Sequence, residues 1–407
     1  MTLDPEEFKR KRQQHDQKKR SRQRSAIVRL VVALMVLVVV GGLIFLLARQ
    51  STPTPQPDST SAPPETVIRI AAAGDLNVTE KTVASGGGSY DYTNAFLEVA
   101  PLLADADLTV LNLEGNLYGE PYGTDRSAPQ SMMTALKNAG VDMLQLANSY
   151  SIYKGMHGLT QTIEGIKLSG MEPLGAYADA QAAAAGKGYT IRTVQGVKIA
   201  FVAFTKGMDG MALPKGTEGC VNLLYTDYSS DYQSIDKEGI NKILTAVQKE
   251  KPDLTVALLH WGSEFNNNIS QSQEDVRDLL FAGGINAIIG THSHYVQEMS
   301  LTESGQFIAY SLGDFFGDAS RAGSEYSVIL ELEITKNETT GETRITNYRY
   351  TPIFTVAEAD QPLRVVQLEQ AMKAYENTAL TAVTPETYAA MEYAKGRIEA
   401  RINPNKK

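Results

Sequence analysis

The chain has 407 residues, 43% of them hydrophobic, so it can form one large domain or two ordinary ones with an ample core. Its single cysteine, Cys220, excludes an intramolecular disulfide and a cysteine metal cage. Residues 1–49 hold 11 Lys and Arg against 4 Asp and Glu, whereas residues 50–407 hold 27 against 43. This acidic remainder disfavours nucleic acid, or any anionic polymer, as a purely electrostatic ligand.

The amino-terminal segment joins a basic stretch to an apolar one. Residues 1–25 are polar and strongly basic, and residues 30–48 form an uncharged run of 19 residues, long enough to span a bilayer. A cleaved signal peptide is the alternative, but its apolar region would be shorter and would end in a small-residue cleavage site. We therefore expect a basic cytoplasmic tail over 1–25 and an uncleaved transmembrane anchor over 26–49. Because basic residues stay inside, the rest of this single-pass protein is expected outside the cell membrane.

A linker and a globular domain are expected next. Residues 50–66 are rich in Pro, Ser and Thr and have no apolar face, which is typical of an extended linker. In the domain predicted over residues 67–357, apolar strand-like runs alternate with amphipathic helices, which indicates an α/β fold. The strands are expected at residues 67–75, 108–113, 143–146, 197–204, 254–259, 285–289 and 307–310.

The end of the chain is expected to form a hairpin followed by a helical tail. Helices are predicted where apolar residues recur every three or four positions. Residues 326–334 and 345–354 have no helix between them and indicate an antiparallel hairpin. Residues 358–407 are expected to form a helical extension that packs on the domain. Its two helices are indicated by Val365, Leu368, Met372 and Tyr375, and by Tyr388, Met391 and Ile398. The earlier helices are indicated by Leu159, Ile163 and Ile166, by Ile240, Ile243, Leu244 and Val247, and by Val276, Leu279 and Leu280.

Polar side chains follow the predicted strands, where open α/β sheets bind their ligands. A single such acid is usually a helix cap or turn residue, and an isolated His-x-His pair usually binds no metal. Their recurrence at six strand ends favours a metal site instead. Carboxylates with imidazoles suit divalent Mn, Fe or Zn, and several loops together could hold two ions. The six segments are GDLN at 74–77, NLEG at 112–115, ANSY at 147–150, HWGSE at 260–264, GTHSH at 290–294 and YSLGD at 310–314.

Taken in order, GDLN, NLEGNL, ANSY, HWGSEF, GTHSHYVQ and YSLGDFF resemble the CapA family of capsule and poly-γ-glutamate synthesis proteins. The resemblance spans residues 67–354 and implies a metallophosphatase-like α/β/β/α sandwich behind the transmembrane helix. It also implies a role in the biosynthesis, export or anchoring of an anionic capsule polymer. The implied partners are that polymer or another cell-envelope substrate, and other polymer-synthesis subunits. The implied metal ligands are Asp75, Glu114, His260, His292 and His294.

The chain departs from the family pattern after the third strand. Where the family usually reads Ala-Asn-Asn-His and then Asp three residues later, this chain has Ser149 for the ligand asparagine, Tyr150 for the histidine and Tyr153 for the acid. A tyrosine, with an ordinary pKa of about 10, is a poorer acid at neutral pH than the histidine that assists the leaving group in phosphatase relatives. Tyr150 is therefore the candidate catalytic residue of an impaired site.

Two functions stay open from the sequence. The favoured one is an accessory protein with weak or no catalysis, in which the metal ligands serve partly for structure and no ion need be bound. The alternative is an active metal-dependent hydrolase of phosphoester or amide bonds. Asn148, Trp261 and Glu264 are the candidate substrate-binding residues, although Trp261 is as well explained by packing in the core. His157 is expected at the surface or at a helix cap.

Overall fold

The computed structural model describes residues 64–359, 361–377 and 383–403. The predicted basic tail, the anchor and most of the linker lie outside these residues. Within the described ranges, no helix is long and apolar enough to cross a membrane. All described elements belong to the compact unit Pro64–Lys407.

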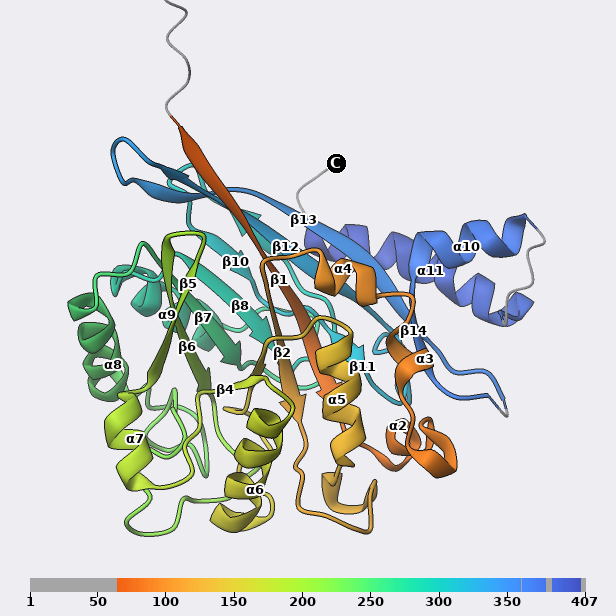
Figure 1. Ribbon diagram of the computed structural model, residues 1–407, viewed down its shortest axis with the longest axis horizontal. Coiled ribbons are helices and arrows are strands. Elements are labelled where there is room, and N and C mark those ends of the chain that lie inside the picture. The colour runs from red at the N-terminus through yellow and green to blue at the C-terminus, as the bar shows by residue number, and fades with distance from the viewer. Residues whose placement is uncertain (1–63, 360, 378–382, 404–407) are drawn as a thin grey trace, which may run out of the picture. The chain divides into compact units, whose positions relative to one another are not determined.

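Sheet A is built around the first strand of the domain (Figure 1). β1 to β4 run parallel, whereas β12, β13 and β14 are antiparallel to their neighbours. An eighth strand, β11, runs parallel to β1 and pairs with its last residues, so that Asp314 lies opposite Asp75. In spatial order the strands are β14 (Arg364–Gln367), β13 (Thr343–Val356), β12 (Tyr326–Asn337), β1 (Glu65–Asn77), β2 (Leu108–Glu114), β3 (Met143–Gln145) and β4 (Glu172–Leu174), with β11 (Asp314–Phe316) beside β1.

Sheet B has six strands, of which the four central ones are parallel. The two edge strands are antiparallel to their neighbours. Because parallel strands end at the same side of a sheet, the residues that follow them gather along one edge. In order the strands are β5 (Tyr189–Val194), β6 (Val197–Thr205), β7 (Leu254–His260), β8 (Ala287–Thr291), β10 (Phe307–Ala309) and β9 (Met299–Leu301).

Alternate side chains of sheet B face two different cores. Ile199 and Phe201 of β6 belong to the large core shared with sheet A, whereas Ala200 and Val202 belong to a second core with α8 (Lys237–Lys249) and α9 (Gln271–Ala282). Such alternation is expected for a strand that is buried on both faces. Figure 1 shows α5 (Gln130–Asn138) and α6 (Gly155–Leu168) over sheet A, away from α8. The layers are therefore α/β/β/α, as predicted.

The remaining helices are short, apart from two at the carboxyl end that contact β13. Their apolar residues Met391 and Ile398 are buried, in agreement with the predicted packing role. These elements are α2 (Glu80–Ala84), α3 (Thr93–Phe96), α4 (Ala100–Ala104), α7 (Ala180–Gly186), α10 (Leu368–Glu376) and α11 (Pro385–Ile402), with 3-10 turns at Gly87–Ser89 and Thr124–Arg126.

The structure corrects the predicted domain ends. Val365, which the apolar spacing assigned to a helix, lies in β14 and pairs with Thr355 of β13. Adjacent β-branched residues, Val365 and Val366, suit an edge strand better than a helix. The tail therefore begins with a strand of sheet A, and α10 starts only at Leu368. At the other end β1 begins at Glu65, two residues before the predicted domain start.

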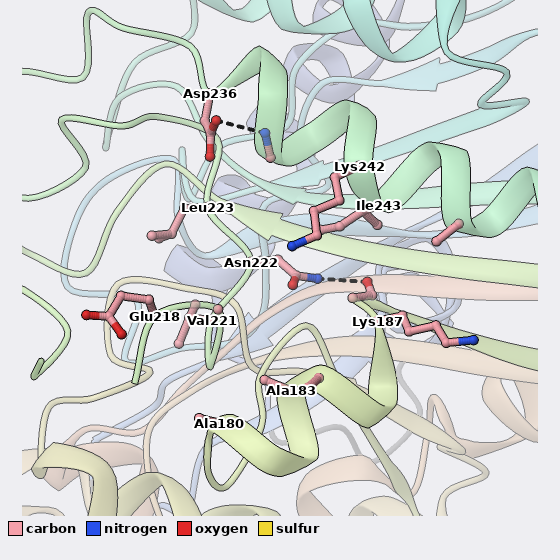
Figure 2. A pocket seen from close by; sticks show the side chains of 15 residues that line it. Ala180, Ala183, Lys187, Glu218, Val221, Asn222, Leu223, Asp236, Lys242 and Ile243 are labelled. Atoms are coloured by element: carbon pink, nitrogen blue, oxygen red, sulfur yellow. Dashed lines mark hydrogen bonds between the residues drawn. The ribbon is translucent and has the colours of Figure 1, made fainter. Parts of the chain in front are cut away.

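A cavity of about 510 Å³ lies between α7 and α8 (Figure 2). Its wall on α7 is formed by alanines such as Ala183, and its wall on α8 by Lys242 and Ile243. The side-chain amide of Asn222 donates to the carbonyls of Gly188 and Ala203 and thereby closes one side. None of the lining residues is among the predicted site residues.

Candidate metal centre

All five predicted ligands lie at the edge where the two sheets meet. Asp75 and Glu114 come from β1 and β2 of sheet A, His260 ends β7 of sheet B, and His292 and His294 follow β8. Each is buried, with at most 6% of its surface exposed. The structure thus brings the five residues together.

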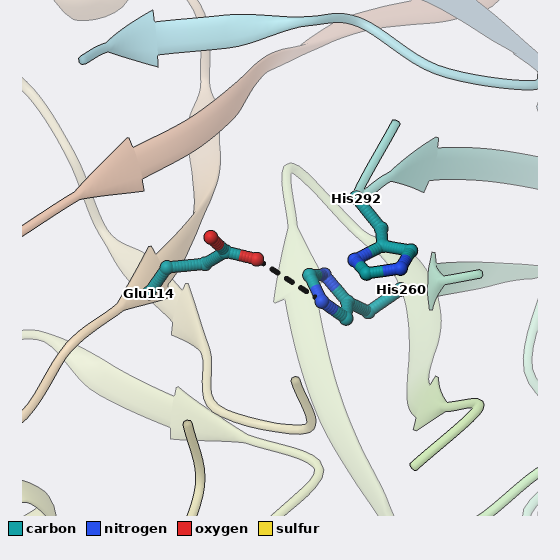
Figure 3. Close-up of side chains that lie close together, drawn as sticks. All are labelled: Glu114, His260 and His292. Carbon is teal, nitrogen blue, oxygen red and sulfur yellow. Dashed lines mark ion pairs between the residues drawn. The ribbon is translucent and has the colours of Figure 1, made fainter. Parts of the chain in front are cut away.

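Glu114, His260 and His292 form the first group, and their ligand atoms all lie within 4.8 Å of one another. Figure 3 shows the glutamate reaching from sheet A toward the two imidazoles of sheet B. Oε1 of Glu114 is 3.0 Å from Nε2 of His260, and the two imidazole centres are 4.3 Å apart. Each residue ends or follows a strand, so the backbone fixes its position.

Asp75, His294 and Asp314 form the second group. Nδ1 of His294 lies 2.7 Å from Oδ1 of Asp314 and 3.8 Å from Oδ2 of Asp75. Asp314 was recognised in the sequence as a strand-end acid but was not assigned as a ligand. Its place in this group follows from the pairing of β11 with β1, which sets it opposite Asp75.

Hydrogen bonds join the two groups through Asp75 and Asn112. Nδ2 of Asn112 donates to Oδ1 of Asp75 at 2.6 Å and lies 3.4 Å from Nδ1 of His260. The backbone N–H of His292 donates to Oδ2 of Asp75 at 3.0 Å. His292 and His294 both have left-handed backbones, with φ of 90° and 58°, a strain that persists only where surrounding contacts enforce it.

Burial makes the charged forms of most of these groups costly. Burial raises the pKa of Asp75 to about 6 and that of Glu114 well above its ordinary value. Burial likewise lowers the pKa of His260 and of His292 well below the ordinary value. Burial alone would lower the pKa of His294 too, but the carboxyls around it, Asp314 first, raise it to about 10.

Unpartnered buried atoms show that a divalent metal fits this cluster. Both ring nitrogens of His292 are buried and have no hydrogen-bond partner among the described residues. Buried polar atoms are rarely left without a partner, and imidazole nitrogens with carboxylate oxygens are the donor set that Mn, Fe or Zn accepts. Each group of three could therefore hold one ion.

Tyr150 and Ser149 border the first group. Oγ of Ser149 lies 3.1 Å from Nε2 of His260. Tyr150 is half-buried, and its hydroxyl accepts a 2.7 Å hydrogen bond from Nη2 of Arg126. Burial raises the pKa of Tyr150 to about 12, although the charge of Arg126 acts in the opposite direction. The phenol therefore holds its proton throughout the neutral range.

The three candidate substrate-binding residues lie in different surroundings. Asn148 is buried and holds the loop, because its Nδ2 donates to Oδ1 of Asn112 and to the carbonyl of Leu113. Trp261 corrects the prediction of a site-lining residue: it is 1% exposed, stacks on Tyr310 and donates to that residue's carbonyl. Its aromatic ring therefore serves packing. Glu264 is exposed on the loop after β7.

Arg126 and Lys206 also belong to the surroundings of the centre, but the sequence did not indicate them. Lys206 directly follows β6, so its position at a strand end was the available signal. Arg126 lies in the long loop after β2, where neither periodicity nor a strand end marks it. His157 is exposed on α6, as expected, and contacts Tyr118.

Comparison with known proteins shows which family this chain resembles. A family model described as "Bacterial capsule synthesis protein PGA_cap" matches residues 69–319, more than half of the chain. The capsule biosynthesis protein CapA of Bacillus anthracis is 26% identical over 262 residues, which cover 61% of this chain and 60% of that protein. The PGA biosynthesis protein CapA of Bacillus subtilis is 23% identical over 354 residues, which cover 84% of each chain.

Two solved structures resemble this chain at low sequence identity. The calcineurin-like phosphoesterase YfkN of Bacillus subtilis has a TM-score of 0.43 at 16% identity, covering 82% of this chain and 100% of that one. A putative 5'-nucleotidase of Staphylococcus aureus has a TM-score of 0.45 at 10% identity, covering 81% and 58%. The family match spans all six strand-end motifs. This chain therefore belongs to the bacterial capsule synthesis protein family PGA_cap.

Proposed function

We propose that this protein assists capsule synthesis by binding an anionic polymer, such as poly-γ-glutamate, at a buried divalent-metal centre, with weak or no hydrolysis. The observation that supports this most is a metal-ligand set with unpartnered buried atoms, bordered by Tyr150 where an efficient acid would be needed. Polymer binding and hydrolysis are separable, because the metal ligands hold the ion whereas a different group must deliver a proton to the leaving group.

Each residue of the centre has a separate role in this proposal. Glu114, His260 and His292 would hold one ion, and Asp75, His294 and Asp314 would hold the other. Bound ions would supply positive charge that attracts and polarises an oxygen of an anionic ligand. Asn112 orients Asp75, and the backbone N–H of His292 fixes the other oxygen of that carboxyl. Tyr150 can donate a hydrogen bond to a ligand but retains its proton.

Active metal-dependent hydrolysis of phosphoester or amide bonds is the second candidate. One observation favours it: each of the two groups has three potential ligand atoms close enough together to hold an ion. Against it stands the weak acidity of Tyr150, whose pKa of about 12 lies far from neutral pH. Turnover by the wild-type protein separates the two candidates.

The protein is further proposed to be a single-pass membrane protein with this domain outside the cell. The support is the order of a basic stretch, residues 1–25, and an uncharged run, residues 30–48, in the sequence. A domain held outside the membrane would meet a capsule polymer as it emerges.

The experiment is equilibrium binding of a γ-linked glutamate oligomer to the purified protein, with added Mn²⁺ and after treatment with a chelator. We expect saturable binding that the chelator abolishes, while the oligomer stays intact during prolonged incubation. Binding that is indifferent to the chelator would contradict a metal centre. Rapid cleavage of the oligomer, or of a chromogenic phosphodiester, would favour the hydrolase.

A further inference from the structure

Two cationic side chains, Arg126 and Lys206, lie beside the metal centre of a strongly acidic domain. Residues 50–407 hold 27 Lys and Arg against 43 Asp and Glu, so the average field of the domain repels an anionic ligand. Attraction must therefore come from local charges. The positions of these two cations are fixed by the backbone around the metal-ligand residues.

Lys206 is tied to the strand that carries His260. Its backbone N–H donates to the carbonyl of His260 at 2.9 Å, and its Nζ donates to the carbonyl of Gly262 at 3.0 Å. The ammonium also lies 5.0 Å from the ring centre of Tyr232. An ammonium has three N–H groups, and within the described residues only one of them has a hydrogen-bond acceptor. The others are available to a ligand.

Arg126 is held by the loop that follows Glu114. Both Asp125 and Arg126 have left-handed backbones, with φ of 52° and 59°, which is unusual for two consecutive residues other than glycine. Asn116, two residues after Glu114, secures them: its backbone N–H donates to the carbonyl of Arg126 and its Nδ2 to the carbonyl of Asp125, each at 2.8 Å. Strained backbone of this kind is concentrated at functional sites.

The guanidinium of Arg126 is aimed at Tyr150. Its Nη2 donates to the hydroxyl at 2.7 Å, and its central carbon lies 4.0 Å from the ring centre. No carboxylate pairs with Arg126 in the described chain, and its charge favours the ionised form of the nearby Glu114. A guanidinium can donate five hydrogen bonds, so this one has donors left for an acidic ligand.

Two carboxyl groups also act on this region. Glu264 and Asp209 are exposed, and they interact electrostatically with Lys206 without a hydrogen bond. Exposed charges are screened by salt more strongly than half-buried ones, so they weaken the field of Lys206 without cancelling it.

We propose that Arg126 and Lys206 form a two-point anion subsite that binds neighbouring carboxylates of an anionic polymer on either side of the metal centre. Arg126 lies in the loop after β2 of sheet A and Lys206 directly follows β6 of sheet B, so the two cations approach the centre from different sheets. A ligand that carries charge at more than one place could meet both. A chain of γ-linked glutamates has that property, whereas a single phosphate does not. The inference rests on the proposed function, because it specifies which polymer groups the chain recognises.

The test compares binding of a γ-linked glutamate oligomer by the full-length, Mn²⁺-loaded protein and by four variants. Arg126→Gln and Lys206→Gln each remove one cation, and each is expected to weaken binding by about tenfold, the value of one charge-assisted hydrogen bond. Arg126→Lys and Lys206→Arg keep the charge and should recover most of the affinity. Metal content, measured in parallel, should be unchanged in all four, because neither residue is a ligand.

Lys242→Gln is the matched control, since it removes an exposed lysine from the cavity between α7 and α8. It should leave binding unchanged. The subsite is overturned if Arg126→Gln and Lys206→Gln bind as the wild type does, or if Lys242→Gln loses as much affinity as they do. In either case metal-dependent binding by the wild type would leave the proposed function standing.

Inorganic phosphate serves as a second probe. Two-point recognition predicts that phosphate competes only weakly with the oligomer and that its own binding is insensitive to loss of one cation. Tight phosphate binding that both glutamine variants abolish would overturn the assignment to spaced carboxylates.

Discussion

The backbone N–H of His292 donates a hydrogen bond to Oδ2 of Asp75, a residue 217 positions earlier in the chain. This bond joins the carboxyl edge of sheet B to that of sheet A at the candidate metal centre. A second backbone contact lies next to it: the N–H of Asp75 donates to the carbonyl of Gly313 at 3.0 Å, and a Cβ at Gly74 would lie 1.7 Å from that same carbonyl oxygen. Asp75 is therefore held by both sheets, through its side chain and through its backbone.

Removing one imidazole should deplete the centre of metal. We expect His292→Ala and His294→Ala each to lower metal retention about tenfold or more, because losing even an outer-shell partner of a ligand typically costs that much. Metal content after dialysis, determined by elemental analysis, is the measurement. His157→Ala, which removes an exposed histidine on α6, is the control. Equal metal content in all three variants would show that the pair does not chelate.

Acid should release the metal and should affect the metal-free protein in the opposite direction. Burial raises the pKa of Asp75 to about 6 in the metal-free folded chain, so protons compete with the metal for this carboxyl and the metal affinity falls as the pH drops below that value. In the metal-free protein the same raised pKa stabilises folding below the ordinary pKa of aspartate and loses that contribution as the pH rises through about 6.

The measurement for this prediction is the free energy of urea unfolding against pH, with and without Mn²⁺. The contribution of Asp75 should make the metal-free protein less stable between about pH 4 and pH 6, partly offset by His260 and His292, whose lowered pKa values act in the opposite direction. The benefit from Mn²⁺ should grow over that range. Parallel curves for the two forms would speak against Asp75 as a ligand.

Restoring the family pattern should raise catalysis. We expect wild-type phosphodiesterase activity near background, and Ser149→Asn with Tyr150→His should raise it by the order of a hundredfold that a positioned general acid supplies. Initial rates on a chromogenic phosphodiester measure this, and Ser149→Asn alone is the control for the added ligand. Brisk turnover by the wild type would refute the prediction, as would a double variant that binds metal normally yet gains nothing.

A side chain at Gly74 should destabilise the domain. Gly74→Ala places a methyl group against the backbone of Gly313, which cannot move as a side chain would, so we expect a loss of about 3 kcal/mol in the free energy of unfolding. Gly88→Ala is the matched control, because nothing lies within 4 Å of a Cβ built there. Equal urea midpoints for the two variants would contradict the role of Gly74 in this contact.

The topology can be tested on intact cells. Protease added outside should release the domain by cutting within residues 50–63, since the preceding charge pattern predicts an outside location for it. Immunodetection of the released fragment, with a cytoplasmic protein as the control for lysis, is the measurement. Complete protection of the domain would overturn the predicted orientation.

The sequence predicted much of the fold because buried parallel strands are continuous apolar runs, and polar residues at their ends are conspicuous. His260 and the pair in GTHSH were identifiable on that basis alone. The sequence does not show which strand ends converge, and the place of Asp314 opposite Asp75 follows only from the pairing of β11 with β1. Arg126 lies in a loop whose course depends on the two carbonyl contacts of Asn116, and no local pattern encodes that.

For two residues, the type of side chain did not determine the structural role, and packing or strand pairing did. Trp261 follows His260 in the chain, yet its ring stacks on Tyr310 and belongs to the second core, with α8 and α9. Val365 fitted a helical spacing by coincidence, and pairing with β13 made it part of a strand.

Elemental analysis of the purified full-length protein tests whether the buried cluster is a metal centre. We expect a transition metal at close to two ions per chain, one for each group of three ligands, and a fall in that number in Asp314→Asn. Protein that contains no stoichiometric metal, and takes up none when Mn²⁺, Fe²⁺ or Zn²⁺ is supplied, would contradict it.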